Sequence, residues 1–389
     1  MSWVREPLVV SFANKASFSE TYGFAGNSGT VNLEGQLLRR PGSTAKTVFL
    51  FMHPTSVLHL LPMPIALADA GLDVLCAASR YPRNDAALIM EKAAIDLGRW
   101  IRHAREALGY ERVVLVGWSG GGALSLFYQA QAERPTITQT PAGDEADLTA
   151  ERLQTADGII FIAAHLSRAE TLTEWIDPSV VDELDPDARE RQYDIYASDC
   201  PNKPPFSADF VAAFRERQVA RNRRITHWAQ EQLERMRRAG GAEQERAFVV
   251  HRTMCDVRWL DPAIDANGRR PGWCYMGDPR MVNVGPVGLA RFTTLRSWLS
   301  QWSYDLSNAK GPMNAAKIVR TPVLQIENTA DDAVPATHNP AIHAALATPD
   351  KEYVRIEGAT HYYVGQPELL ARCIATIVDW TERKRLVAI

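Results

Sequence analysis

This sequence of 389 residues has few cysteines, no long apolar run and a small net charge. The five cysteines are odd in number, lie far apart and contain no C-x-x-C pair: Cys76, Cys200, Cys255, Cys274 and Cys373. This spacing argues against a disulfide scaffold and favours buried thiols in a reducing cytoplasm.

The apolar runs are short, as at 48–52 and 158–164, whereas a membrane-spanning helix needs about 20 apolar residues. The N-terminal segment MSWVREPLVV has no basic stretch followed by a long apolar one, so we expect no secretory signal. The formal net charge of −3 argues against a basic nucleic-acid binder. We therefore expect a cytoplasmic protein that binds neither membrane nor nucleic acid.

The remaining composition is that of a folded protein, with 46% hydrophobic and 23% charged residues. These fractions exclude disordered, collagen-like and coiled-coil classes. At about 150 residues per domain, the length predicts two to three units, or one large α/β domain with an insertion.

Alternation of apolar strands with helices is the main structural pattern. Strands buried on both faces are typical of a mostly parallel sheet with helices on both sides, so the sequence predicts the α/β class. A β-rich opening precedes this alternation, with strands at 8–12 and 30–38. The later strands are expected at 47–52, 72–78, 112–117, 158–164, 322–327 and 352–357, and the helices at 58–70, 86–108, 119–131, 337–346 and 369–383.

Two segments interrupt the alternation of strands and helices. Residues 133–157 are polar and predict a surface loop. Residues 166–312 show no strand–helix repeat and are rich in tryptophan, which predicts an insertion between a first core part, 1–165, and a second, 313–389. Its helix at about 208–238 carries eight arginines against four acidic residues, with apolar residues interleaved. We interpret it as a solvated amphipathic helix rather than a nucleic-acid surface or an anion-binding element.

The strongest chemical motif is G-W-S-G-G at 117–121, which has the G-x-S-x-G pattern. It follows an apolar strand and opens a helix, the context in which this pattern lifts a serine above the sheet edge. The sequence therefore predicts that Ser119 is a nucleophile, with the helix N-terminus available to stabilise an oxyanion.

A serine nucleophile needs a base and an orienting acid. Of the nine histidines, His361 follows the last predicted strand, and E-N-T-A-D-D-A-V-P at 327–335 follows the strand before it. The C-terminal ends of parallel strands meet at one sheet edge, so we expect both segments near Ser119. Asp331 is preferred over its neighbour Asp332 as the acid, from its place three residues before Val334.

The order Ser119, Asp331, His361, together with the G-x-S-x-G, D-x-x-V-P and G-x-x-H segments, resembles the α/β-hydrolase family. The resemblance covers about 47–165 and 315–385. It implies the α/β-hydrolase fold, a Ser-His-Asp triad, and a mainly helical cap formed by the insertion, which lies where family members carry a variable lid.

The resemblance also implies an oxyanion hole. The family usually has His-Gly-x after the strand at 47–52, and this chain has His53-Pro54-Thr55. By position, the backbone amides of Gly120 and Thr55 would bind the oxyanion, although Pro54 changes the loop because it has no N–H and a fixed φ. The Thr55 hydroxyl is an alternative donor. We interpret His53 as a brace for this loop. Trp118, beside the nucleophile, is expected to contact the substrate.

These features together predict a serine hydrolase of the carboxylesterase type that acts on a small hydrophobic or aromatic ester through an acyl-enzyme. Thioester, lactone, amide or carbon–carbon hydrolysis and acyl transfer stay open on the same triad, as does a non-catalytic binding protein of this fold. No metal-ligand or phosphate-binding motif is present in the sequence, and we expect no cofactor. The oligomeric state is open, with a homodimer among the options.

Overall fold

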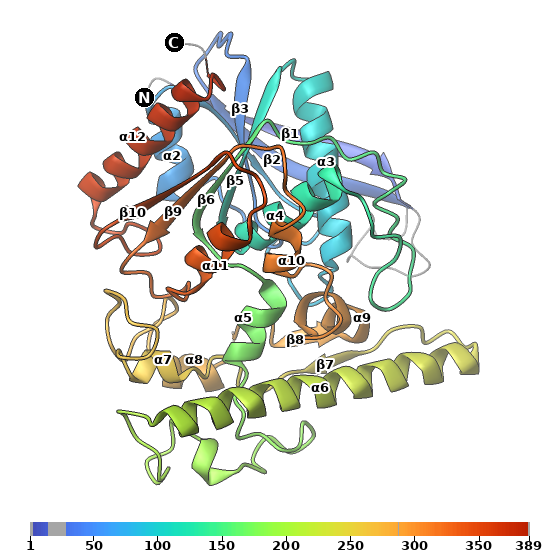
Figure 1. Cartoon of the computed structure of the whole chain (residues 1–389). Coiled ribbons are helices and arrows are strands. Elements are labelled where there is room, and N and C mark those ends of the chain that lie inside the picture. Colours follow the sequence, from blue (N-terminus) through green and yellow to red (C-terminus); the bar gives the residue numbers. More distant parts are fainter. Residues whose placement is uncertain (1–2, 15–28, 287, 388–389) are drawn as a thin grey trace.

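The computed structural model describes residues 3–14, 29–286 and 288–387. A core built on one twisted sheet forms the upper part of the molecule in Figure 1, and a cap of helices and irregular segments lies beyond one edge of that sheet. The long helix α6 runs across the cap, and light-green segments lie on its side away from the core.

Among the described residues, the core sheet has eight strands in the order β1-β2-β4-β3-β5-β6-β9-β10. The strands from β4 to β10 pair in parallel, and β2 is antiparallel to both of its neighbours. This confirms the predicted mostly parallel sheet. Its strands are β1 (Val4–Ala13), β2 (Thr30–Arg39), β3 (Thr47–Met52), β4 (Asp73–Ala77), β5 (Arg112–Ser119), β6 (Gly158–Ala164), β9 (Val323–Asn328) and β10 (Lys351–Ile356).

Helices cover both faces of the sheet (Figure 1), as the apolar strands predict. Two hydrophobic clusters result, one under α3, α4, α10 and α11 and the other under α2 and α12. The core helices are α2 (Pro62–Asp69), α3 (Met90–Glu106), α4 (Gly120–Glu133), α10 (Gly311–Ala315), α11 (His338–Ala345) and α12 (Pro367–Arg383).

Two of the core helices begin four residues later than the sequence predicts. The helix expected at 58–70 begins at Pro62, because proline is favoured in the first turn of a helix, where its missing N–H has no intrahelical role. The helix expected at 86–108 begins at Met90, whose N–H donates to the Ser300 hydroxyl of the cap (2.8 Å). A distant part of the chain therefore takes part in defining where α3 begins.

The cap combines helices with long irregular segments. It carries a two-stranded antiparallel sheet, and Ser207 and the left-handed Gly240 cap its longest helix at its two ends. Its elements are α5 (Arg168–Trp175), the 3₁₀ turn η1 (Arg191–Tyr193), α6 (Ala208–Ala239), β7 (Ala247–Val249), α7 (Val257–Leu260), α8 (Pro279–Val284), β8 (Phe292–Thr294), α9 (Leu295–Ser297) and the π-helical turn η2 (Trp298–Trp302).

The segment 133–157 corrects one prediction. It was expected to be a surface loop, yet Ala142 is buried in the hydrophobic cluster of the cap. Asp144 also accepts a hydrogen bond from Arg296 of α9 (2.7 Å). The segment therefore packs against the cap and stabilises it. The domain boundaries at 165 and 312 stay a prediction.

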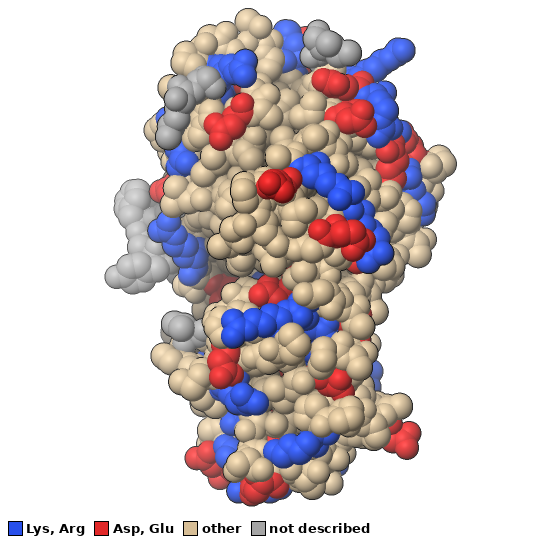
Figure 2. All heavy atoms as spheres, turned by 90° about the vertical axis from the view of Figure 1, so that its left-hand side faces the viewer, with Lys and Arg blue, Asp and Glu red and all other residues tan. Residues whose placement is uncertain are grey.

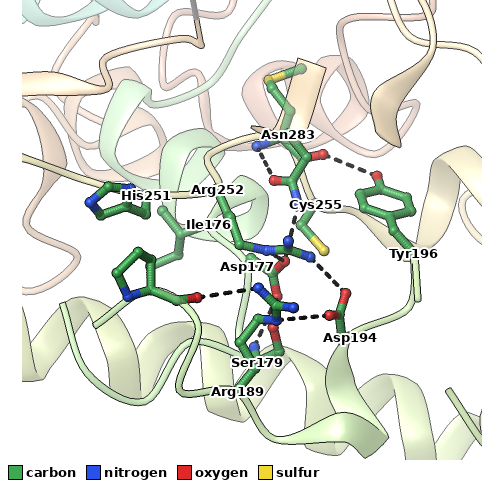
Figure 3. A network of polar contacts seen from close by, with 12 residues as sticks. Ile176, Asp177, Ser179, Arg189, Asp194, Tyr196, His251, Arg252, Cys255 and Asn283 are labelled. Carbon is green, nitrogen blue, oxygen red and sulfur yellow. Dashed lines mark hydrogen bonds and ion pairs between the residues drawn. The ribbon is translucent and has the colours of Figure 1, made fainter. Parts of the chain in front are cut away.

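A buried ion-pair network holds the irregular half of the cap together (Figure 3). Asp177, fully buried just after α5, accepts hydrogen bonds from Arg252, Ser179 and Asn283. Arg252 also donates to Asp194 (2.6 Å). Burial alone would raise the pKa of Asp177, but the Arg252 charge and these hydrogen bonds outweigh it and lower the pKa.

We expect Asp177→Ala to destabilise the cap by about 3–5 kcal/mol, because it leaves the mostly buried Arg252 without its main partner. Urea unfolding followed by tryptophan fluorescence measures the change. Arg223→Ala, which breaks the exposed pair with Asp305, is the matched control and should leave stability nearly unchanged. Equal unfolding midpoints for the wild type and Asp177→Ala would contradict this account of the network.

The surface in Figure 2 carries Lys and Arg side chains interspersed with Asp and Glu over both core and cap. The five cysteines are buried and unpaired, as predicted. In the described ranges no helix combines the length and apolar character required to cross a bilayer. No cluster of three or more His, Cys, Asp or Glu side chains suited to a metal ion occurs there either.

Candidate active site

Ser119 stands at the sharp turn between β5 and α4, where the sequence places it. Its backbone is strained, with φ 55° and ψ −128°, a conformation that costs a non-glycine residue about 1–3 kcal/mol. Gly117 allows the turn to close, because a Cβ there would lie 2.9 Å from the Cα of Gly122. The serine side chain is thereby held at the C-terminal edge of the sheet.

His361 and Asp331 lie at the same edge, on the loops after β10 and β9. The Ser119 hydroxyl lies 3.1 Å from Nε2 of His361, and Nδ1 of His361 lies 2.9 Å from a carboxylate oxygen of Asp331. Both His361 and Asp331 are buried. In the tautomer that fits both contacts, Nδ1–H donates to Asp331 and Nε2 accepts from Ser119.

The backbone holds the Asp331 carboxylate in place. Its Oδ1 accepts the N–H groups of Ala333 and Val334, both at 2.7 Å, which leaves Oδ2 for His361. The side chain of Asp332 makes no such contact with His361, and burial, followed by the nearby Asp331 charge, raises its pKa. The structure thus brings Asp331, the preferred residue of the pair, to the imidazole.

Trp118 packs on the histidine loop rather than pointing away from it. Its ring centroid is 4.6 Å from that of His361 and 5.3 Å from that of Tyr362. The indole N–H approaches the His361 carbonyl oxygen at 3.4 Å. Because Trp118 also lines the cavity in front of Ser119, it is placed both to steady His361 and to contact a ligand.

A cavity of about 110 Å³ opens in front of Ser119, between the sheet edge and the cap. Six of its fourteen lining residues are large aromatic or aliphatic side chains, supplied by both core and cap: Trp118, Leu172, Trp175, Tyr275, Leu289 and Tyr362. Burial raises the pKa of Tyr275 and of Tyr362, so both hydroxyls stay neutral. The wall therefore suits an apolar, uncharged group.

Arg168 supplies a guanidinium to the cavity wall. Its Nη2 donates to Asp85 of the core (2.8 Å), and its Nε donates to Gln301 of the cap (2.7 Å). The carboxylate of Asp85 balances its charge. We interpret Arg168 as a link between core and cap that borders the cavity.

The two backbone amides predicted to bind an oxyanion differ in their surroundings. Gly120 is the first residue of α4, where a backbone N–H has no partner inside the helix. The Thr55 amide is already engaged, because it donates to Nδ1 of His53 (3.1 Å). The oxyanion role predicted for the Thr55 amide therefore does not fit the geometry.

Three buried histidines near the site are held neutral. Burial, the largest cause in each case, lowers the pKa of His53 to about 3, that of His338 to about 4, and that of His165 well below 6.5. The rings of His165 and His338 lie with centroids 5.7 Å apart. Protonation of either would place a charge in an enclosed region. These side chains therefore make the folded state less stable as the pH falls.

We expect stability to fall as the pH drops from about 6.5 toward 4, because the unfolded chain then binds protons that folded His338 does not. One such histidine contributes about 1.4 kcal/mol per pH unit. Between about pH 6.5 and pH 5, His338→Gln should therefore lose about 2 kcal/mol less stability than the wild type. Urea unfolding at several pH values measures the difference, and identical pH dependence in both proteins would contradict it.

Sequence reasoning missed several residues that line the cavity. His53 was interpreted as a loop brace, and His165, Arg168 and Tyr275 received no site role, although all four border the space in front of Ser119. One signal was available for His53, since it directly follows a parallel strand at the Ser119 edge. The cap residues gave no such signal, because no repeat or motif marks which of them face the core.

Comparisons with known proteins give the fold. No family model matches the chain, and no curated protein matches its sequence. Among solved structures, that of DcsB in complex with its substrate analogue has a TM-score of 0.52 at 12% identity, covering 97% of this chain and 99% of that one. Together with the strand order and the serine elbow, this likeness identifies the α/β-hydrolase fold.

Two further solved structures align over most of the chain with lower scores. The hypothetical protein PA2218 from Pseudomonas aeruginosa has a TM-score of 0.48 at 13% identity, covering 96% of this chain and 94% of that one. The siderophore hydrolase EstB from Aspergillus fumigatus has a TM-score of 0.47 at 13% identity, covering 90% and 95%.

Proposed function

We propose that the protein is a serine hydrolase that cleaves a small, uncharged, apolar or aromatic carboxylic ester through an acyl-enzyme on Ser119. The observation that carries this proposal is the continuous chain of contacts from Ser119 through His361 to Asp331, at 3.1 Å and 2.9 Å. Such a chain activates a hydroxyl that is otherwise a weak nucleophile.

In the first half of the reaction, Ser119 Oγ attacks the acyl carbonyl carbon while His361 Nε2 takes the hydroxyl proton. Asp331 holds the imidazole with Nδ1 protonated and stabilises the imidazolium that forms. The carbonyl oxygen becomes an oxyanion that accepts the Gly120 N–H. Collapse of this intermediate breaks the ester C–O bond, and His361 protonates the departing alcohol.

In the second half, water attacks the acyl-enzyme carbonyl and gives its proton to His361. The second tetrahedral intermediate then releases the carboxylic acid and returns the proton to Ser119. Every step is proton transfer and acyl transfer, so the cycle balances without a redox partner.

The cavity supports the substrate class. Its volume of about 110 Å³ lies below the roughly 300–1,000 Å³ of pockets that enclose a drug-sized ligand, which favours a short acyl chain or a single ring. Its aromatic wall, neutral tyrosines and charge-balanced Arg168 favour an uncharged group over an anion.

A panel of p-nitrophenyl esters tests the function. Acetyl, butyryl, benzoyl and decanoyl esters are compared by p-nitrophenol release, with titration of the acid product to separate hydrolysis from acyl transfer. We expect the butyryl and benzoyl esters to give the highest kcat/KM and the decanoyl ester the lowest. No p-nitrophenol release from any member above the buffer rate would contradict ester hydrolysis.

A further inference from the structure

His53 directly follows β3 at the sheet edge that carries Ser119, and it lines the cavity in front of that serine. Its side chain is buried, with 8% exposed. Nδ1 accepts two backbone N–H groups, from Thr55 at 3.1 Å and from Ser56 at 2.9 Å. The mechanism above gives this imidazole no part.

These two contacts fix the tautomer of His53. Because Nδ1 accepts two hydrogen bonds it carries a lone pair, and a neutral imidazole must then carry its single proton on Nε2. Burial, helped by the charges of Arg168 and His361, lowers the His53 pKa to about 3, so the ring stays neutral at ordinary pH. His53 therefore presents one N–H donor of fixed identity and no charge.

The Nε2–H group lies beside the oxyanion site. Nε2 is 2.5 Å from the point that a Cβ on Gly120 would occupy, so it sits directly against the residue whose amide begins α4. Within residues 3–14, 29–286 and 288–387, no protein group accepts a hydrogen bond from this Nε2. Its donor is thus available to a ligand in the cavity.

The loop after β3 offers no competing backbone donor at its first positions. Pro54 has no N–H, and the amides of Thr55 and Ser56 both donate to His53. We propose that Nε2–H of His53 is the second oxyanion donor, acting with the Gly120 amide on the intermediate formed at Ser119. This inference rests on the proposed ester hydrolysis and adds a catalytic residue to it.

The step needs no proton from His53. When Ser119 Oγ bonds to the acyl carbon, the carbonyl π electrons move to oxygen, and the Ser119 proton goes to His361. The oxyanion accepts N–H bonds from Gly120 and His53, and both donors keep their protons. A neutral donor aimed at this oxygen stabilises the transition state more than the ester, and its loss typically costs about 10²–10³ in kcat.

Two substitutions separate this role from that of a loop brace. In His53→Asn the amide oxygen takes the place of Nδ1 and can accept from Thr55 and Ser56, but no atom reaches the place of Nε2. In His53→Gln the amide nitrogen reaches the place of Nε2, but the acceptor for the loop is lost. His53→Asn therefore keeps only the acceptor for the loop, and His53→Gln keeps only the N–H donor toward the cavity.

We expect kcat for the butyryl ester to fall about 10²–10³-fold in His53→Asn with KM within a few-fold, and to recover at least about tenfold in His53→Gln. A purely bracing histidine gives the reverse order, with His53→Asn near the wild type. That order would overturn the proposal. Circular dichroism and thermal unfolding confirm that both variants fold.

An NMR experiment distinguishes failure of this inference from failure of the proposed function. In ¹⁵N-histidine-labelled protein, His53 should show the Nε2–H tautomer without titration across the neutral range. A boronic acid that bonds to Ser119 places an anionic oxygen at the site and should shift the His53 Nε2–H proton downfield. An adduct on Ser119 with an unmoved His53 signal would overturn the inference alone, whereas wild-type protein with neither adduct nor turnover would overturn ester hydrolysis itself.

Discussion

Ser119→Ala is expected to lower ester turnover by at least about 10⁴-fold, to the background that binding and oxyanion donors alone can support. The reason is geometric, because the Ser119 hydroxyl is the group placed 3.1 Å from the base on His361. Substrate binding should persist, since the aromatic wall of the cavity is unchanged. Steady-state p-nitrophenyl butyrate hydrolysis by the wild type and the variant measures the effect.

Ser56→Ala is the matched control for this substitution. Ser56 lines the same cavity, and in the described structure the hydrogen bonds of the His361 ring go to Asp331 and Ser119. We expect its turnover to stay within a few-fold of the wild type. Turnover near the wild-type level in Ser119→Ala, with normal unfolding, would exclude Ser119 as the nucleophile.

Asp331→Asn is expected to lower kcat by about 10⁴-fold while leaving the fold intact. Because Ala333 and Val334 both donate to Oδ1 at 2.7 Å, the new amide must keep its oxygen there and turn its NH₂ toward His361. Nδ1 of His361 would then have to accept, which moves the imidazole proton to Nε2. In that tautomer His361 cannot accept the Ser119 proton.

Asp332→Asn is the matched control, because the same change is made one residue along the same loop. The Asp332 carboxyl makes no hydrogen bond to His361, and its pKa is already raised by burial. We expect its kcat to stay within a few-fold of the wild type. A large loss of activity in Asp332→Asn but not in Asp331→Asn would assign the orienting role to the other carboxylate.

Much of the core could be predicted from the sequence because its signals are local and strong. Strands such as β3 and β5 are nearly continuous apolar runs, and a strand buried on both faces has few alternatives to a parallel sheet. The Ser119 turn, the Asp331 loop and the His361 loop follow three such strands. Their convergence follows from topology, since the C-terminal ends of parallel strands share an edge.

The cap could not be predicted in the same way, because its stability depends on contacts between distant and irregular segments. The buried pair of Asp177 and Arg252 joins residues 75 positions apart, and neither lies in a periodic pattern. The polar segment 133–157 contributes Ala142 to the cap, which its composition conceals. The spacing of apolar residues along the sequence cannot predict polar pairs between such distant positions.

The loop at 53–55 shows what the sequence cannot predict about the orientation of a backbone amide. The sequence locates the loop correctly, after β3, and it shows that Pro54 lacks an N–H. It does not show in which direction the Thr55 amide points. Only the fold places the His53 ring where it takes up that amide and presents its own N–H beside Gly120.

Active-site labelling with a p-nitrophenyl alkylphosphonate tests the central claim most directly, because the reagent bonds only to a nucleophile activated for attack at an acyl-like centre. Intact-protein mass spectrometry followed by peptide mapping locates the adduct. The account predicts one phosphonate per chain, on Ser119, with parallel loss of turnover and no adduct in Ser119→Ala. Stoichiometric modification of another serine, or full turnover after complete labelling of Ser119, would contradict it.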